Sequence, residues 1–377
     1  MTRLAIIRQR YRSDGGAERF VSQALIALSE NSQLDVNVIT RSWEGKPTTE
    51  YQVFKCDPKV SSRISREKDF ATCALNVIAE EGFDLVQSHE RIPGCDIYRA
   101  GDGVHKVWLE QRCRILNPIQ RFWQGLSKYH KYVLSAEREM FNHPQLKAVI
   151  CNSDMVKAEI LQCFNAPPER IHVIHNAVDS ERFCPVIDAE KKQLRNDYKL
   201  PEEANIAIYV GSGFQRKGLD AAIRAVALSG KYHLLVVGKD KKQSRYEALC
   251  KMLGIADKVH FIGVQQDTSP FYKLADVMLL PTLYDPFPNV ILEAMSSGLP
   301  VITSTKCGGA EFIENGREGF VTDALDTAGI SEALLTLDDV ELRKSCGFQA
   351  RKRVEKYDNR YLADRLSGLY QQLLISA

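Results

Sequence analysis

Short apolar runs alternate with helical patterns along most of the chain, and this alternation restricts the possible folds more than any other feature. Each run has the length of one buried strand. Buried strands separated by helices are typical of βα units and of mainly parallel sheets. The sequence therefore predicts an α/β fold, with strands at 4–7, 36–40, 85–87, 148–151, 171–174, 206–210, 233–237, 259–262, 277–280 and 301–303.

The length of 377 residues predicts two domains, because a single core stops growing well below this size. A polar, helix-poor stretch from His175 to about Asp188 separates the two series of strands and is interpreted as the linker. In paired parallel-sheet domains, the default ligand site is a cleft outside the carboxyl ends of the strands.

Composition excludes several classes of protein. Lys and Arg number 50 against 48 Asp and Glu, which gives no case for a nucleic-acid-binding protein. The ten cysteines form no CxxC pair, and scattered single cysteines suit a reducing compartment. No apolar stretch approaches the ~18 residues of a membrane span. We therefore expect a cytoplasmic protein with at most peripheral membrane contact.

Two glycine-rich turns follow predicted strands. Gly15 and Gly16 precede a predicted helix, where free backbone N–H groups favour an anion, although a plain tight turn is the alternative. The second turn, 211–218, fits neither the dinucleotide fingerprint nor the Walker A pattern. Its adjacent Arg216 and Lys217 suit a diphosphate, and a solvated basic pair is the alternative.

The segment 283–303 carries the most informative pattern. Pro286 and Pro288 hold a loop extended, and a helix is predicted to start near Asn289. Asp285 and Glu293 would then flank the start of that helix. Two carboxylates beside free N–H groups can bind sugar hydroxyls and a diphosphate together. The alternative, that Glu293 is an ordinary surface residue, fits poorly with its apolar neighbours.

These residues resemble the retaining glycosyltransferases of the large bacterial family 4 group, which have the GT-B fold: two Rossmann-like parallel-sheet domains facing a central cleft. The family has a Glu-x7-Glu signature, and Asp285 and Glu293 have that spacing, with Asp in place of the first Glu. The resemblance implies an acceptor-binding domain at 1–175, a nucleotide-sugar-binding domain at 176–360, and a C-terminal helix at about 361–377 that packs back on the first domain.

The resemblance also implies roles for individual residues. Catalytic roles fall to Asp102, Arg216, Lys217 and Asp285, and acceptor contacts to His89 and Arg91, although a lone His at a strand end is as often structural. No Asp-x-Asp pair is present, so we expect neither a metal nor a cofactor. The expected donor-binding residues are Gly15, Gly16, Gly213, Arg216, Lys217, Asp285, Phe287, Asn289, Val290 and Glu293.

A narrower resemblance, carried by residues 40–45 and 92–102 and the basic aromatic segment that follows, is to the sugar transferases that extend the lipopolysaccharide core from heptose. It implies a UDP-hexose donor, a lipid-linked oligosaccharide acceptor and work at the cytoplasmic face of the inner membrane. Segment 106–147 has eight basic and three acidic residues with interleaved aromatics, which predicts docking on an anionic membrane surface. The alternatives are a nucleotide-sugar epimerase or other GT-B enzyme, a different lipid-linked or polysaccharide acceptor, and a sensing module without turnover.

Overall fold

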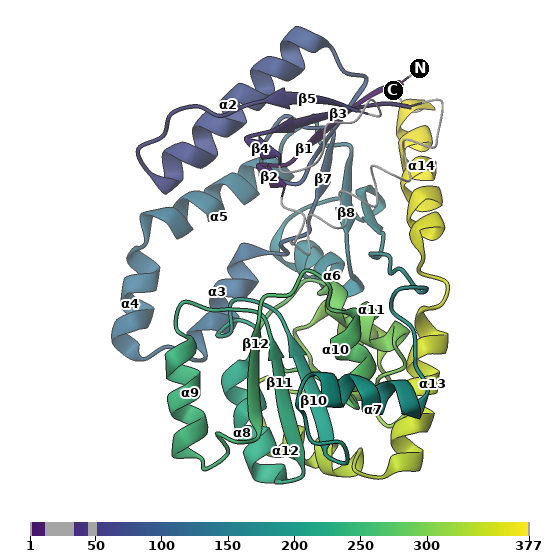
Figure 1. Ribbon diagram of the computed structural model, residues 1–377. Coiled ribbons are helices and arrows are strands. Elements are labelled where there is room, and N and C mark those ends of the chain that lie inside the picture. Colours follow the sequence, from purple (N-terminus) through teal and green to yellow (C-terminus); the bar gives the residue numbers. More distant parts are fainter. Residues whose placement is uncertain (1, 12–33, 44–50, 376–377) are drawn as a thin grey trace. The chain divides into compact units, whose positions relative to one another are not determined.

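The computed structural model describes residues 2–11, 34–43 and 51–375, and the chain divides into two units (Figure 1). Unit 1 comprises Met1–Asn176 and Asn359–Ala377, and unit 2 comprises Ala177–Asp358. The two predicted glycines Gly15 and Gly16 lie outside the described residues.

Unit 1 is built on a seven-stranded sheet in which every described pair of neighbours is parallel. A two-stranded parallel pair, β2 (Arg10–Tyr11) and β4 (Ser42–Trp43), accompanies it. In sheet order the seven strands are β5 (Gln52–Lys55), β3 (Leu34–Thr40), β1 (Thr2–Ile7), β6 (Leu85–Ser88), β7 (Ile97–Arg99), β8 (Ala148–Cys151) and β9 (Ile171–Val173).

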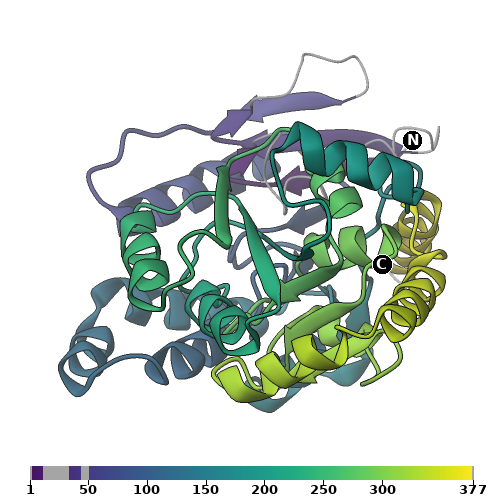
Figure 2. The ribbon, with the colours of Figure 1, turned by 60° about the horizontal axis from the view of Figure 1, so that its bottom comes forward.

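The described helices of unit 1 connect these strands, except the last one, which comes from the C-terminal end of the chain. Tyr370 in that last helix donates from its hydroxyl to Gln87 Oε1 at 2.8 Å, which fixes it to the end of β6. Figure 1 and Figure 2 both show α4 at the far end of an arm formed with α3 and α5. The helices are α2 (Arg63–Glu81), α3 (His105–Cys113), α4 (Pro118–Leu126), α5 (Lys128–Phe141), α6 (Asp154–Cys163), the 3₁₀ turn η1 (Pro168–Arg170) and α14 (Asn359–Ile375).

Unit 2 has a six-stranded sheet, again parallel at every pair: β12 (Val259–Gly263), β11 (Tyr232–Val237), β10 (Asn205–Val210), β13 (Val277–Leu280), β14 (Val301–Ser304) and β15 (Gly319–Thr322). The two parallel sheets confirm the predicted fold class. The helices of unit 2 are α7 (Asp188–Asp197), α8 (Leu219–Ser229), α9 (Gln243–Met252), α10 (Ser269–Leu274), α11 (Asn289–Ser296), η2 (Gly308–Phe312), α12 (Thr327–Thr336) and α13 (Val340–Val354).

The strands of unit 2 lie in the middle of its hydrophobic core. Residues 277–280 of β13 are fully buried, and helices α8 and α11 pack apolar side chains into the same cluster. A parallel sheet covered on both faces needs apolar side chains on both faces. This explains why its strands appear in the sequence as continuous apolar runs.

One feature of unit 1 differs from the sequence-based expectation of single cysteines. Cys56, directly after β5, forms a disulfide with Cys73 in α2, and their Cα atoms lie 5.8 Å apart. The two residues are 17 positions apart, so no short-spacing motif marks them. The other eight cysteines are free.

Candidate active site

The glycine-rich turn of unit 2 connects β10 to α8. Gly218 is the N-cap of α8 with φ of 77°, and a Cβ there would lie 1.8 Å from the carbonyl oxygen of Pro281. Gly211 has φ of 150°, and its Cβ would lie 2.4 Å from Cδ of Lys217. Both positions therefore require glycine. At Gly211 the missing side chain leaves the space through which Lys217 folds back over the turn.

Lys217 and Arg216 both reach the carboxylate of Asp285. Lys217 Nζ lies 3.0 Å from Asp285 Oδ2, and Arg216 Nη1 lies 3.5 Å from the same oxygen. The residue Asp285 is only 6% exposed. Burial opposes the charge of Asp285, but the two cations outweigh it and hold the pKa of that carboxyl below its ordinary value. The predicted basic pair is thus paired with a buried carboxylate, and Lys217 is the more buried of its two cations.

Backbone hydrogen bonds fix this group of charges in place. The carbonyl of Arg216 accepts from Leu283 N at 2.8 Å and from Thr282 Oγ1 at 3.0 Å. Asp285 N donates to Lys306 O, and Asp285 O accepts from Gly308 N. The turn after β10, the loop after β13 and the loop after β14 are therefore tied together at the carboxyl ends of three neighbouring strands.

Helix α11 begins at Asn289, as the sequence predicts, and its N-cap Pro288 makes no side-chain capping bond. Glu293, one turn later, is 4% exposed, and Tyr272 in α10 donates its hydroxyl to Glu293 Oε2 at 2.9 Å. A buried carboxylate is not an ordinary helix surface residue. The remaining expected donor contacts, Phe287, Asn289 and Val290, lie at the start of the same helix, with Phe287 and Asn289 buried.

Asp240 is a site residue that sequence reasoning missed. It follows β11, and its Oδ2 accepts from the backbone N–H of Phe214 at 3.0 Å, while Oδ1 accepts from Lys242 N at 2.8 Å. Asp240 thus holds the middle of the glycine-rich turn from the neighbouring strand. The available signal was the Gly238-Lys239-Asp240 turn after the predicted strand 233–237.

The predicted residues of unit 1 lie at the carboxyl ends of β6 and β7. Arg91 Nη1 is 3.7 Å from Asp102 Oδ2, and the Asp102 side chain is 54% exposed. Arg91 also donates from Nε to Glu137 Oε1 at 2.9 Å. The structure therefore brings Arg91 and Asp102 together and adds the buried Glu137, which sequence reasoning missed because the partner lies 46 residues away.

His89 belongs to a buried polar chain. Tyr370 donates to Gln87 Oε1, and Gln87 Nε2 contacts His89 Nε2 at 3.0 Å. Because an amide nitrogen only donates, this assigns the acceptor role to His89 Nε2. Burial, with the charges of Arg99 and Arg8, holds the pKa of His89 well below its ordinary value. These contacts favour a structural histidine over an acceptor contact.

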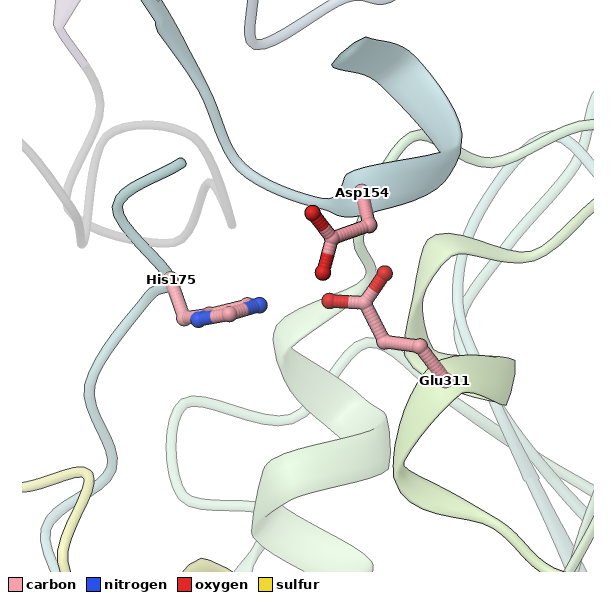
Figure 3. Close-up of side chains that lie close together, drawn as sticks. All are labelled: Asp154, His175 and Glu311. Atoms are coloured by element: carbon pink, nitrogen blue, oxygen red, sulfur yellow. The ribbon is translucent and has the colours of Figure 1, made fainter. Parts of the chain in front are cut away.

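Three other side chains of metal-ligating type are drawn in Figure 3. Asp154 begins α6, and His175 follows β9; both belong to unit 1. Glu311 lies on η2 of unit 2. Because they come from different units, we build no site from them.

Comparison with known proteins assigns the family. The model described as Glycosyltransferase Family 4 matches residues 14–182, and the one described as Glycosyl transferases group 1 matches residues 190–353. The chain is a group 1 glycosyltransferase of the GT-B type. This confirms the enzyme class that the motif resemblance implied.

The chain is also similar to individual glycosyltransferases of lipopolysaccharide synthesis. The lipopolysaccharide glucosyltransferase WaaG of Escherichia coli (strain K12) is 28% identical, covering 76% of each chain. The lipopolysaccharide core biosynthesis glycosyltransferase LpsE of Rhizobium meliloti (strain 1021) is 27% identical, covering 96% of each. A crystal structure of WaaG, a glycosyltransferase involved in lipopolysaccharide biosynthesis, has a TM-score of 0.83 at 26% identity, covering 97% of this chain and 99% of that one.

Proposed function

We propose that this glycosyltransferase moves a hexose from a UDP-sugar to the heptose region of a lipopolysaccharide core acceptor, with retention of configuration and without a metal. The observation that carries the proposal is the cationic pair Lys217 and Arg216 on a glycine-rich turn that leads into α8. Charge on a leaving diphosphate needs such fixed positive groups when no metal supplies them. The names of WaaG and LpsE support the choice of acceptor.

The proposed reaction breaks the bond between the hexose C1 and the diphosphate oxygen, and forms a bond between C1 and an acceptor oxygen on the same face. The departing phosphate oxygen takes the proton of the acceptor hydroxyl. Lys217 contributes its charge to the departing diphosphate, and the N–H groups that begin α11 face the same charge. Glu293 holds the donor ribose hydroxyls, and Asp285 contacts the hexose.

Transfer by the purified chain tests this proposal. The chain is incubated with UDP-glucose or UDP-galactose and core oligosaccharide from a strain that lacks the chain's gene, and the product is followed by mass spectrometry and by NMR of the new anomeric centre. We expect one added hexose with the anomeric configuration of the donor. An inverted product rejects retention, and epimerised UDP-sugar without transfer indicates the epimerase instead. Transfer only to another acceptor, such as inositol phosphate, rejects the core assignment.

Chelation tests the metal-independent mechanism. We expect the transfer rate to stay unchanged in excess EDTA, because Arg216 and Lys217 supply the positive charge that a divalent cation would otherwise provide. Initial rates are compared before and after chelation, with a metal-dependent transferase as the control. Activity lost in EDTA and restored by Mn²⁺ or Mg²⁺ contradicts the mechanism.

We also propose that the enzyme docks on an anionic membrane through α4. Within the described residues no helix combines the length and apolar character needed to cross a bilayer. Helix α4 nevertheless exposes one apolar stripe at i, i+3, i+4 and i+7 spacing: Ile119, Phe122, Trp123 and Leu126. One aromatic residue of segment 106–147 cannot contribute to membrane contact as predicted: Phe141 is buried and stacks on Phe164.

Vesicle sedimentation tests the docking surface. Replacement of Arg121, Lys128 and Lys131 by Glu is expected to abolish most binding to anionic vesicles, since each basic residue near such a surface contributes about 1 kcal/mol. Binding of the wild type should fall steeply as salt rises. A triple variant with the same charge change on unit 2, at the exposed Lys241, Lys251 and Lys344, serves as control. Equal loss in both triples, or equal wild-type binding to neutral vesicles, contradicts the assignment to this segment.

A further inference from the structure

Glu137 is a buried carboxylate in the middle of α5. It is 1% exposed, and its Oε1 accepts from Arg91 Nε at 2.9 Å. The backbone N–H of His105 donates to the same carboxylate, at 3.0 Å from Oε1 and 3.2 Å from Oε2. A buried charge persists only when it is paired and hydrogen-bonded. Here both requirements are met by groups from distant parts of unit 1.

The bond to His105 supplies a cap that α3 otherwise lacks. Helix α3 begins at His105, and its N-cap residue Val104 makes no side-chain capping bond. A carboxylate at a helix N-terminus satisfies a free N–H group and interacts favourably with the helix dipole. Glu137 therefore fixes the start of α3, which is also the end of the turn that carries Asp102.

Arg91 connects Glu137 to that turn from the other side. Its Nε bonds Glu137, its Nη1 lies 3.7 Å from Asp102 Oδ2, and its Nη2 donates to Gly103 O at 3.5 Å. The guanidinium is a rigid planar fork, so one edge held by Glu137 sets the direction of the other groups. The Arg91 side chain is 19% exposed, and it contacts the turn at both Asp102 and Gly103.

We infer that Glu137 is a positioning residue for the transfer reaction: it acts through Arg91 and through the start of α3 to hold the Asp102 carboxylate in the orientation that the catalytic role of Asp102 requires. The inference rests on the proposed function and on the catalytic role that the family resemblance implies for Asp102. In this inference Arg91 orients Asp102, whereas the sequence predicted that Arg91 contacts the acceptor.

Kinetics of Glu137→Gln test the inference. The amide keeps the shape of the side chain but removes the charge that orients Arg91. Misplacement of a reacting group by about 1 Å lowers the rate by about 10²-fold, so we expect kcat to fall by about 10–10²-fold. The KM for the UDP-sugar should stay unchanged, because Lys217, Asp285 and Glu293, to which the proposed function assigns donor contacts, belong to unit 2 and not to the unit that holds Glu137. Glu139→Gln, at an exposed carboxylate on the same helix, is the matched control and should behave as wild type.

A double-mutant cycle with Asp102→Asn separates positioning from general support of the fold. If Glu137 acts through Asp102, adding Glu137→Gln to Asp102→Asn lowers kcat little further. Hydrogen exchange at residues 101–105 should be faster in Glu137→Gln, with the rest of the sheet unchanged. Should this variant fail to fold, Arg91→Lys replaces it in the cycle, because lysine keeps the charge but lacks the fork.

The outcomes distinguish the two proposals. The positioning role is overturned if Glu137→Gln lowers kcat by the same factor in the wild type and in Asp102→Asn, or if Glu137→Gln alone keeps the wild-type kcat. Either result leaves the proposed function intact. Absence of hexose transfer by the wild type overturns the proposed function itself. Non-additive losses together with faster exchange at 101–105 support the positioning role.

Discussion

Lys217→Ala is expected to lower kcat by about 10²–10³-fold, the usual effect of removing one preorganised donor to a developing negative charge. The KM for the UDP-sugar should change far less, because the ammonium matters most when the diphosphate departs. Lys217 is the nearer of the two cations to Asp285 and is fixed against the turn at Gly211. Steady-state kinetics with saturating acceptor measure both constants.

Loss of stability must be separated from loss of catalysis in this variant. Removing Lys217 leaves Asp285 buried beside Arg216 alone, and breaking one side of a buried ion pair is strongly destabilising. The double variant Lys217→Ala with Asp285→Asn removes both charges, so its melting temperature should recover while its activity stays low. Lys251→Ala on α9 is the control. Wild-type kcat in folded Lys217→Ala places the diphosphate elsewhere.

Arg216→Ala is expected to have a smaller effect of the same kind. Its side chain is 39% exposed, and its Nη1 lies 0.5 Å farther from Asp285 Oδ2 than Lys217 Nζ does, at 3.5 against 3.0 Å. A more solvated charge stabilises a departing anion less. The ranking of the two variants therefore reports how deeply each cation lies in the site.

Most of the buried strands could be predicted from the sequence because each is a continuous apolar run. The prediction missed β7, which is buried in the middle of its sheet but has only three residues and ends with Arg99. The predicted strands 148–151 and 277–280 coincide with β8 and β13. Strands at exposed edges or with polar residues gave no such signal. The predictions therefore missed β5, whose side chains are mostly exposed, and the edge strand β15, which opens with Gly319.

The two candidate sites also differ in how much of each could be predicted from local sequence patterns. In unit 2 the proposed donor-binding residues lie in two compact motifs, so Lys217, Asp285 and Glu293 could all be chosen from sequence spacing. In unit 1 the contacts join residues that are far apart: Glu137 meets Arg91 across 46 positions. The local sequence of α5 does not distinguish Glu137 from the other acidic residue of the helix, because the partners of Glu137 come from other parts of unit 1. Tertiary pairs of this kind were therefore found only in the structure.

Glu293→Gln is expected to weaken binding of UDP by about 10–10²-fold, because hydrogen bonds to a charged group contribute about 1.5–3 kcal/mol and each 1.4 kcal/mol is a factor of ten. The carboxylate is 4% exposed and held at Oε2 by Tyr272, so its orientation is fixed before any ligand binds. Calorimetry with UDP alone measures the effect without turnover. In contrast with Lys217→Ala, the loss should be present before any diphosphate departs.

Tyr272→Phe is the matched control for this prediction. It removes the hydroxyl that donates to Glu293 Oε2 but keeps the carboxylate and its charge. If Glu293 binds the ribose directly, Tyr272→Phe should weaken UDP binding less than Glu293→Gln does, because it disturbs only the orientation of the carboxylate. Equal losses in the two variants would mean that Glu293 acts by packing against α10. Unchanged UDP affinity in folded Glu293→Gln would contradict the ribose assignment, and the second acid of the signature would then serve the structure of α11 alone.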